Sequence, residues 1–260
     1  MKYIYCITGY SGSGKDTMYK ELQKRFNLPL LPTYSNRPKR SDNENSSTKC
    51  IGKEEFQKII DSNNFIECRS YTVTDGSGKN MNWRYLTPIP DTSKSYYLIA
   101  SFDQMIGVHD CLPKDKMRLI PIVLDVHDSI LLIRTIIRQF GPDYTDLAIK
   151  QTYDYTYHCP TLSLRVDECD NAAIELCNRF IRDHKWKSEF DTIPSPLHFK
   201  NNSNNEKEVA ASQIANYMRS VSWHHSKKFN GYLIDDITDF LDQASKAMQE
   251  RLILQKTMII

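Results

Sequence analysis

A glycine-rich segment near the N-terminus contains the residue types needed to bind phosphate. The sequence GYSGSGKDT at residues 9–17 places glycines ahead of Lys15 in the pattern GxxxxGK. Glycines let backbone N–H groups turn toward phosphate oxygens, and a following helix adds the positive end of its dipole. The lysine can then reach the terminal phosphates as a movable charge. The segment predicts a nucleotide phosphate loop, with contacts from Gly9, Ser11, Gly12, Ser13, Gly14, Lys15, Asp16 and Thr17.

The two residues after Lys15 bear on metal binding. Asp16 stands where such loops usually have a hydroxyl residue, and Thr17 follows it. Mg²⁺ prefers oxygen ligands and is often held by one or two protein groups together with phosphate oxygens. Asp16 could ligate the ion, hold a metal-bound water, or leave the contact to Thr17, and these alternatives stay open. The prediction is Mg²⁺ bound together with ATP.

Two segments further along suit a second phosphate and a base. Residues 33–40 (TYSNRPKR) contain Arg37 and Arg40, and arginine forks bind phosphate oxygens bidentately while staying charged. Residues 64–67 (NFIE) end at Glu67. Its carboxylate can accept from the N1–H and N2–H groups of guanine together. These residues are therefore candidates for an acceptor site.

Arg134 and Arg138 interrupt an apolar run, ILLIRTIIRQF. Their spacing places both on one face of a helix. Unpaired charge within an apolar face is costly, which favours a function for both residues. They could stabilise the charge that spreads over a transferred phosphoryl group.

These segments together resemble the guanylate kinase family over about residues 1–185. The resemblance rests on the phosphate loop, residues 33–40, the Glu-Phe pair at residues 55–56 and the segment ending at Glu67. It implies that Arg37 and Arg40 clamp the phosphate of an acceptor nucleotide, that Glu67 reads guanine, and that Arg134 and Arg138 lean over the ATP phosphates. Thr33 or Ser35 would help to hold the acceptor phosphate.

The sequence also departs from the family pattern. The family's tyrosine ahead of the Glu-Phe helix is missing near residues 48–50, and its Tyr-Gly-Ser/Thr turn is best matched by residues 83–87 (WRYLT), which include Tyr85. The family's aspartate is matched by Asp103, displaced along the chain, and only Lys150 lies near the place of its lid arginine. Tyr85 and Asp103 complete the predicted acceptor-binding residues.

Strand and helix patterns alternate around these residues. Apolar runs predict strands at 2–8, 96–101 and 118–126, and helical periodicity predicts helices at 16–26, 54–61 and 128–140, the last capped by Asp128. Loops are expected at 35–49 and 74–82, followed later by a helix at 144–155, a strand at 162–166 and a helix at 171–184. The alternation predicts an α/β fold, a three-layer P-loop kinase fold with a mostly parallel sheet flanked by helices.

The composition changes in the last third of the chain. Residues 1–187 are predicted to form the guanylate kinase-like P-loop domain, with an acceptor-binding insert at about 33–88 and a lid at about 138–155. Residues 188–206, rich in asparagine, read as a linker. Residues 207–260 are expected to form an α-helical extension with helices at 207–223 and 233–256. Because the second helix carries an apolar stripe, the extension is a candidate homodimer surface. A chain that ends near residue 190 is expected to keep its activity.

Overall composition excludes several classes of protein. Lys and Arg total 34 and Asp and Glu total 32, a net charge of +2 that does not indicate a general nucleic-acid surface. No apolar run reaches the roughly 20 residues that a membrane span needs. The seven cysteines are scattered without a CxxC pair, which favours reduced thiols and a cytoplasmic protein.

The sequence thus predicts an enzyme, a nucleoside monophosphate kinase that transfers the γ-phosphoryl group of Mg-ATP to GMP or dGMP. Lys15, Arg134 and Arg138 are its predicted catalytic residues. Two alternatives stay open: a deoxynucleoside monophosphate kinase with another base preference, and a non-catalytic guanylate kinase-like module that binds partners. The intact Lys15 argues against the second, because a pure binding module has no need of a phosphate-reaching lysine.

Overall fold

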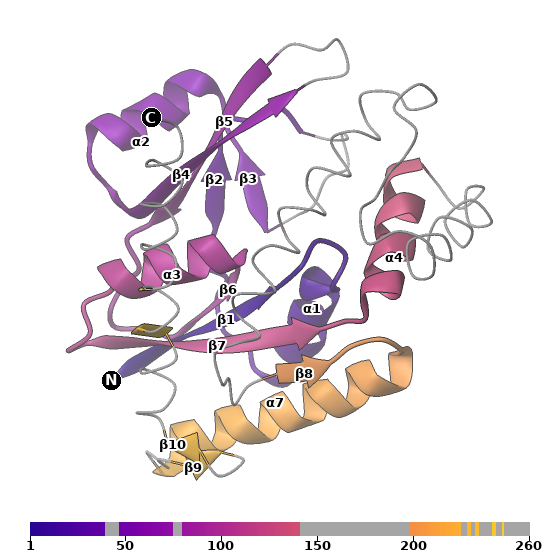
Figure 1. The fold of residues 1–260 in the computed structure, drawn as a ribbon. Helices are drawn as coiled ribbons and strands as arrows, with labels where there is room; N and C mark the ends of the chain where they lie inside the picture. Colours follow the sequence, from indigo (N-terminus) through magenta and orange to yellow (C-terminus); the bar gives the residue numbers. More distant parts are fainter. Residues whose placement is uncertain are drawn as a thin grey trace.

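A parallel four-stranded sheet forms the centre of the molecule (Figure 1). Its strands, in spatial order, are β6 (Tyr96–Ile99), β1 (Lys2–Gly9), β7 (Met117–Asp125) and β8 (His198–Lys200). β1 and β7 lie in the middle, and almost every side chain along them is buried, as expected for near-continuous apolar runs. The computed structural model describes residues 1–39, 47–74, 80–140, 198–224, 228–229, 232–233, 241–242 and 246.

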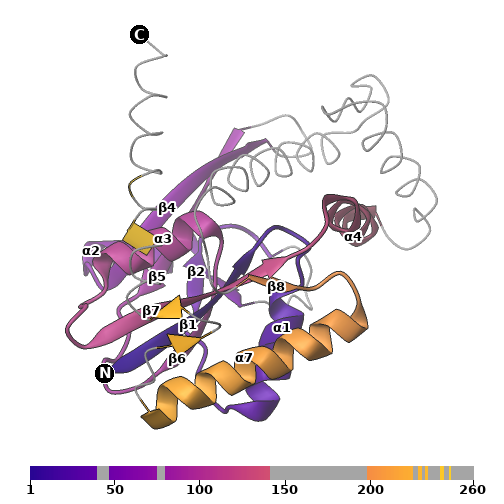
Figure 2. The same ribbon diagram turned by 60° about the horizontal axis from the view of Figure 1, so that its bottom comes forward.

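Helices cover both faces of this sheet. Figure 2 shows α1 (Lys15–Arg25) and α7 (Asn204–His224) together on one face and α3 (Phe102–Cys111) on the other. α1 buries Met18 and Leu22 against the sheet. The result is three layers, and it confirms the predicted α/β fold with a mostly parallel sheet flanked by helices.

A second sheet lies on the far side of α3 (Figure 1). Its antiparallel pair, β4 (Phe65–Thr74) and β5 (Asn80–Pro88), is long, although the sequence predicts a loop over 74–82. Both strands contain β-branched and aromatic residues, which favour strand formation. Two short strands complete the sheet, in the order β3-β2-β5-β4, and one helix flanks it; these are β2 (Thr33–Ser35), β3 (Thr48–Cys50) and α2 (Lys53–Asp61).

α4 (Asp128–Phe140) follows β7 and has the predicted bounds. Asp128 does not cap it as predicted: the backbone N–H groups of Ile130 and Leu131 both donate to the carbonyl of His127, so Asp128 lies in the first turn. In the first turn, the negative charge of Asp128 interacts favourably with the positive end of the helix dipole. The elements expected at 144–155, 162–166 and 171–184, and Lys150, lie outside the described residues.

The C-terminal part of the chain belongs to the core, in contrast to the predicted linker over 188–206. Within that range, β8 pairs in parallel with β7, and α7 already begins at residue 204. Phe199 is 4% exposed, and α7 buries Ile214 and Met218 in the same core cluster as β1. The asparagines form hydrogen bonds to the backbone: the Asn201 backbone N–H donates to Asp125 O at 2.9 Å, and Asn202 Oδ1 accepts from the His127 N–H at 2.7 Å.

Farther on, β9 (Lys228–Phe229) and β10 (Tyr232–Leu233) pair in antiparallel fashion. Of the predicted helix at 233–256, Leu233 belongs instead to strand β10, and residues 241, 242 and 246, the others described, are helical. Leu241 is buried in the main core, and the Asp242 carboxylate lies 2.9 Å from His109 Nε2 on α3. None of the helices in the described ranges is long and apolar enough to cross a membrane.

Candidate active site

The loop between β1 and α1 has a backbone shape that requires glycine. Gly12 has φ +83° and Gly14 has φ +87°, values that other residues adopt only with strain. Space excludes side chains as well. A Cβ atom on Gly12 would lie 2.8 Å from Thr135 Oγ1 on α4, and one on Gly14 would lie 2.7 Å from Asn201 Nδ2. The loop is thus held against α4 and against the turn between β8 and α7.

Lys15 begins α1 directly after this loop. Its Nζ donates to the backbone carbonyls of Gly9 and Tyr10, each at 2.8 Å, so the ammonium group lies over the start of the loop. Asp16 and Thr17 follow in the first turn and are exposed. Their oxygens suit a Mg²⁺ ion that takes its other ligands from phosphate and water. Within the described ranges no three His, Cys, Asp or Glu side chains gather as a metal site.

Arg134 connects three parts of the site. Its guanidinium donates to the carbonyls of Gly12 at 3.5 Å, Asn201 at 3.0 Å and Asn202 at 3.2 Å. Partial burial lowers the pKa of Arg134 from its ordinary value. The predicted catalytic arginine therefore lies beside the glycine loop and also ties it to the β8–α7 turn. Arg138 lies one helical turn further along α4, and its side chain lies outside the described part of the structure.

Asn201 is a residue of this site that sequence reasoning missed. Its Nδ2 donates to Ser13 O at 2.6 Å, and its side chain is buried. The signal was weak, because the strand ahead of it is only three residues long and the asparagines around it resemble a linker. Recognising 198–200 as a strand beside β7 would have placed Asn201 at the same sheet edge as the loop.

The predicted phosphate clamp of the acceptor lies around β2. Ser35 Oγ donates to Arg84 O at 3.0 Å and accepts from the Arg37 backbone N–H at 3.2 Å. The Arg37 guanidinium donates to Pro38 O at 2.9 Å, and the residue is 4% exposed. Arg37 is therefore turned into the protein in this conformation. Arg40 lies outside the described residues.

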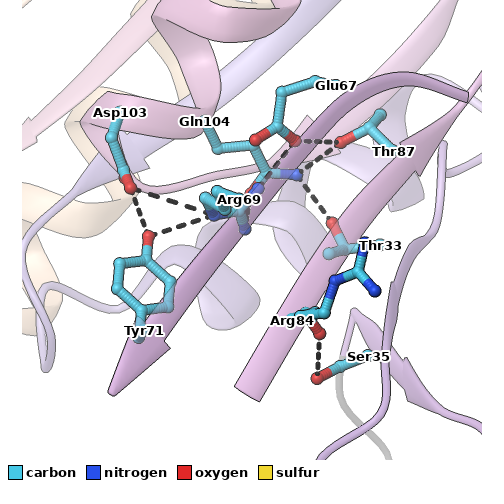
Figure 3. A network of polar contacts seen from close by, with 9 residues as sticks. All are labelled: Thr33, Ser35, Glu67, Arg69, Tyr71, Arg84, Thr87, Asp103 and Gln104. Carbon is cyan, nitrogen blue, oxygen red and sulfur yellow. Dashed lines mark hydrogen bonds and ion pairs between the residues drawn. The ribbon is translucent and has the colours of Figure 1, made fainter. Parts of the chain in front are cut away.

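Polar side chains from four elements meet between the second sheet and α3 (Figure 3). Alternate residues of β4 share one face, which directs Glu67, Arg69 and Tyr71 toward α3. Asp103 and Gln104 come from the first turn of α3. We call this group the β4–α3 polar cluster; its members are Thr33, Glu67, Arg69, Tyr71, Thr87, Asp103 and Gln104.

Arg69 is the centre of the cluster. Its terminal nitrogens donate to Glu67 Oε2 and to Gln104 Oε1, both at 2.8 Å, and its Nε donates to the Tyr71 hydroxyl at 3.0 Å. The Tyr71 hydroxyl in turn donates to Asp103 Oδ2. The guanidinium also lies 5.3 Å from the ring centre of Tyr85. One arginine thus joins β4, β5 and α3.

The remaining contacts of the cluster fix the Glu67 carboxylate. The Thr87 hydroxyl donates to Glu67 Oε2 at 3.0 Å. Gln104 Nε2 donates to the hydroxyls of Thr33 and Thr87 at 2.8 and 2.9 Å. Glu67 itself is 8% exposed. Its carboxylate therefore has a fixed position rather than that of a mobile surface group.

Burial and neighbouring charges shift the pKa values in the cluster. Burial raises the pKa of Glu67, although Arg69 and Thr87 act in the opposite direction. Burial lowers the pKa of Arg69, but Tyr71, Glu67 and Asp103 together outweigh it and raise the value. Burial and the Asp103 charge raise the pKa of Tyr71. Arg69 consequently remains a cation at neutral pH, with the tyrosine protonated.

The structure brings together some predicted acceptor residues and adds others. Thr33, Glu67 and Asp103 belong to the cluster, and Tyr85 lies beside it, with its ring centre 5.5 Å from that of Tyr71. The members that sequence reasoning missed are Arg69, Tyr71, Thr87 and Gln104. The cluster adjoins the glycine loop, because Phe102, next to Asp103, packs against Tyr10 with ring centres 5.5 Å apart.

Comparisons with known proteins find similar solved structures but no matching family model or curated protein. No family model matches the chain, and no curated protein matches it. Among solved structures, the guanylate kinase from Anaplasma phagocytophilum is similar: it is 14% identical with a TM-score of 0.45, and the match covers 85% of this chain and 87% of that chain. At this identity and TM-score the similarity assigns neither a family nor a substrate to this chain.

Proposed function

We propose that this chain is an ATP-dependent nucleoside monophosphate kinase, which transfers the γ-phosphoryl group of Mg-ATP to a nucleoside monophosphate. The observation that carries the proposal is the pairing of two sites. A glycine loop with Lys15 over it adjoins a fixed polar cluster through the contact of Tyr10 with Phe102. Phosphoryl transfer needs two nucleotides held in line more than it needs covalent chemistry from the protein.

Each predicted site residue would have a distinct role in binding the two nucleotides or in stabilising the transferred group. Lys15 would exchange its two carbonyl partners for the β- and γ-phosphates, since a lysine is a movable point charge. Arg134, already beside Gly12, would stabilise the charge on the transferred group. Mg²⁺, held at Asp16 or Thr17, would supply further positive charge to the phosphates. Arg37 and Arg40 would hold the acceptor phosphate.

The acceptor base is the finer part of the proposal. The resemblance to guanylate kinases favours GMP or dGMP, read by Glu67. A second candidate is a kinase with another base preference, and the contact of Arg69 with Glu67 at 2.8 Å favours it, because one carboxylate oxygen is already in use. The cytoplasmic location and a homodimer through the C-terminal helices stay predictions.

The test is ADP release from purified protein with Mg-ATP and a panel of all nucleoside and deoxynucleoside monophosphates. We expect turnover with at least one acceptor, and a loss of at least about a hundredfold in the Lys15→Ala variant. Lys24→Ala is the matched control, because Lys24 is an exposed lysine of the same helix and its ion pair is with Glu21 on that helix. ATP binding without turnover on any acceptor would favour the binding module instead. Unchanged turnover in Lys15→Ala would remove Lys15 from the catalytic residues.

A further inference from the structure

The two oxygens of the Glu67 carboxylate are in different situations. Oε2 accepts from Arg69 at 2.8 Å and from the Thr87 hydroxyl at 3.0 Å. Oε1 accepts no hydrogen bond from the residues that the structure describes. To read the N1–H and N2–H groups of guanine side by side, a carboxylate needs both oxygens. In this protein one of them is already occupied.

Arg69 provides donors next to the remaining oxygen. Arginine has five N–H groups, and the bonds to Glu67, Gln104 and Tyr71 use three of them. Each terminal nitrogen of Arg69 therefore keeps one N–H that donates to no other described residue. The Arg69 side chain is 14% exposed and the Glu67 side chain is 7% exposed, so a small part of the surface of the pair reaches solvent. An acceptor oxygen and guanidinium donors thus stand next to each other.

A bound base would not readily displace Arg69. Removing the guanidinium would break its hydrogen bonds to Glu67, Gln104 and Tyr71 and its contact with the Tyr85 ring. It would also leave the Glu67 carboxylate without its cation in a site where the residue is 8% exposed. The guanidinium is therefore part of the surface that the base meets.

We propose that Glu67 and Arg69 together recognise an imide edge of the acceptor base, a ring N–H beside a carbonyl oxygen. This inference rests on the proposed function. The ring N–H donates to Glu67 Oε1, and the carbonyl accepts from Arg69. Thymine, uracil, hypoxanthine and guanine all present this edge. Arg69 is then the specificity-determining residue, and the 2-amino group of guanine is not read.

Adenine and cytosine present the reverse order, an exocyclic N–H beside a ring nitrogen that accepts. With the base position set by the clamped phosphate, their ring nitrogen would face a carboxylate oxygen, and two acceptors would oppose each other. A buried polar group left without a partner is costly, so these bases are disfavoured.

The first measurement is the binding of monophosphates to the full chain by calorimetry, without ATP, using GMP, IMP, dTMP, UMP, AMP and CMP. GMP and IMP differ only in the 2-amino group, and we expect their dissociation constants to agree within about threefold, whereas AMP and CMP bind at least about tenfold more weakly. Binding of dTMP or UMP would show that the protein recognises the imide edge of a pyrimidine base. Binding of IMP and GMP alone would show that it is read on a purine.

The second measurement is the same series on the Arg69→Ala variant. Removing the guanidinium frees Glu67 Oε2 for the 2-amino group, so the preference for GMP over IMP should rise by about tenfold. Arg25→Ala is the matched control: Arg25 is an arginine of α1 that pairs with Glu208 at 3.8 Å, away from the cluster, and the GMP to IMP ratio should stay unchanged. Should Arg69→Ala fail to fold, the comparison of GMP with IMP on the unaltered protein still tests whether the 2-amino group is read.

Several results would overturn the inference. They are a GMP preference over IMP of tenfold or more in the unaltered protein, AMP or CMP binding as tightly as IMP, or binding of none of the monophosphates. ADP release in the presence of Mg-ATP separates the two proposals. Monophosphate binding with the expected pattern but without turnover would retain the base reading and refute the kinase function.

Discussion

Replacing Gly107 with alanine is expected to weaken acceptor binding and leave ATP binding unchanged. Gly107 lies on α3 opposite Glu67, and an added Cβ atom would come within 2.8 Å of Glu67 Cγ and 3.7 Å of Cδ. Carbon atoms pack at about 3.5–4.0 Å, so the carboxylate must shift. It cannot shift freely, because Arg69 and Thr87 hold its Oε2 atom.

The size of the effect follows from these contacts. Overpacking of this kind costs about 1–3 kcal/mol, and alanine is favoured over glycine inside a helix by about 1 kcal/mol. The net loss of stability should therefore be small, about 0–2 kcal/mol. Misplacing Glu67 should cost one hydrogen bond to a charged group, about 1.5–3 kcal/mol, which corresponds to a rise in the acceptor KM of about ten- to a hundredfold.

The assay is steady-state kinetics with each substrate varied in turn, together with thermal unfolding. Gly52→Ala is the matched control, because a Cβ atom there would meet nothing within 4 Å and Gly52 has an extended backbone conformation. We expect no change in the acceptor KM for the control. An unchanged acceptor KM in Gly107→Ala, or an equal rise in the KM for ATP, would refute the assignment of Glu67 to the acceptor site.

Three further predictions concern the core, the pH dependence and the glycine loop. A chain ended at residue 190 should lose cooperative unfolding in calorimetry, because β8 and α7 bury several apolar side chains worth about 1.5–3 kcal/mol each; a folded, active fragment would contradict this. The acceptor kcat/KM should fall on the acid side with a midpoint above 4.5, because burial raises the pKa of Glu67 and a protonated Oε1 would oppose its own O–H to the N–H of the base; a midpoint at or below that value would count against it. Asn201→Ala should raise the KM for ATP by about tenfold, since Ser13 O loses its donor, while exposed Asn216→Ala should not.

The central layers of the fold could be predicted from the sequence because the signals are local. β1 and β7 are continuous apolar runs, and α4 has an amphipathic pattern with matching bounds. β8 could not be predicted in this way: it has three residues, and Phe199 is its only buried one. Its existence depends on pairing with β7, which is distant in the sequence. For the same reason composition favoured a separable tail, whereas the structure places α7 in the core.

The candidate site shows the same division between local and distant information. The glycine loop lies where the motif predicts it, and its partner Asn201 comes from the other end of the chain. The roles of the predicted residues stay predictions, because a motif names positions and does not show what contacts them. Arg37 illustrates this: the motif predicts a phosphate clamp, and the structure has its guanidinium on the carbonyl of Pro38.

Arg69 could have been found from the sequence, and its effect could not. The alternation of a strand places residues 67, 69 and 71 on one face, so an arginine beside Glu67 was predictable once β4 was extended past residue 67. What Arg69 does depends on Gln104 of α3, which accepts a hydrogen bond from it, and on Thr87 of β5, which donates to the same Glu67 oxygen. These partners hold the guanidinium on one carboxylate oxygen and leave the other open. A match of Glu67 to a guanine-reading position therefore shows that a carboxylate is present, whereas the number of its oxygens available to a base is set by neighbours that only the folded chain assembles.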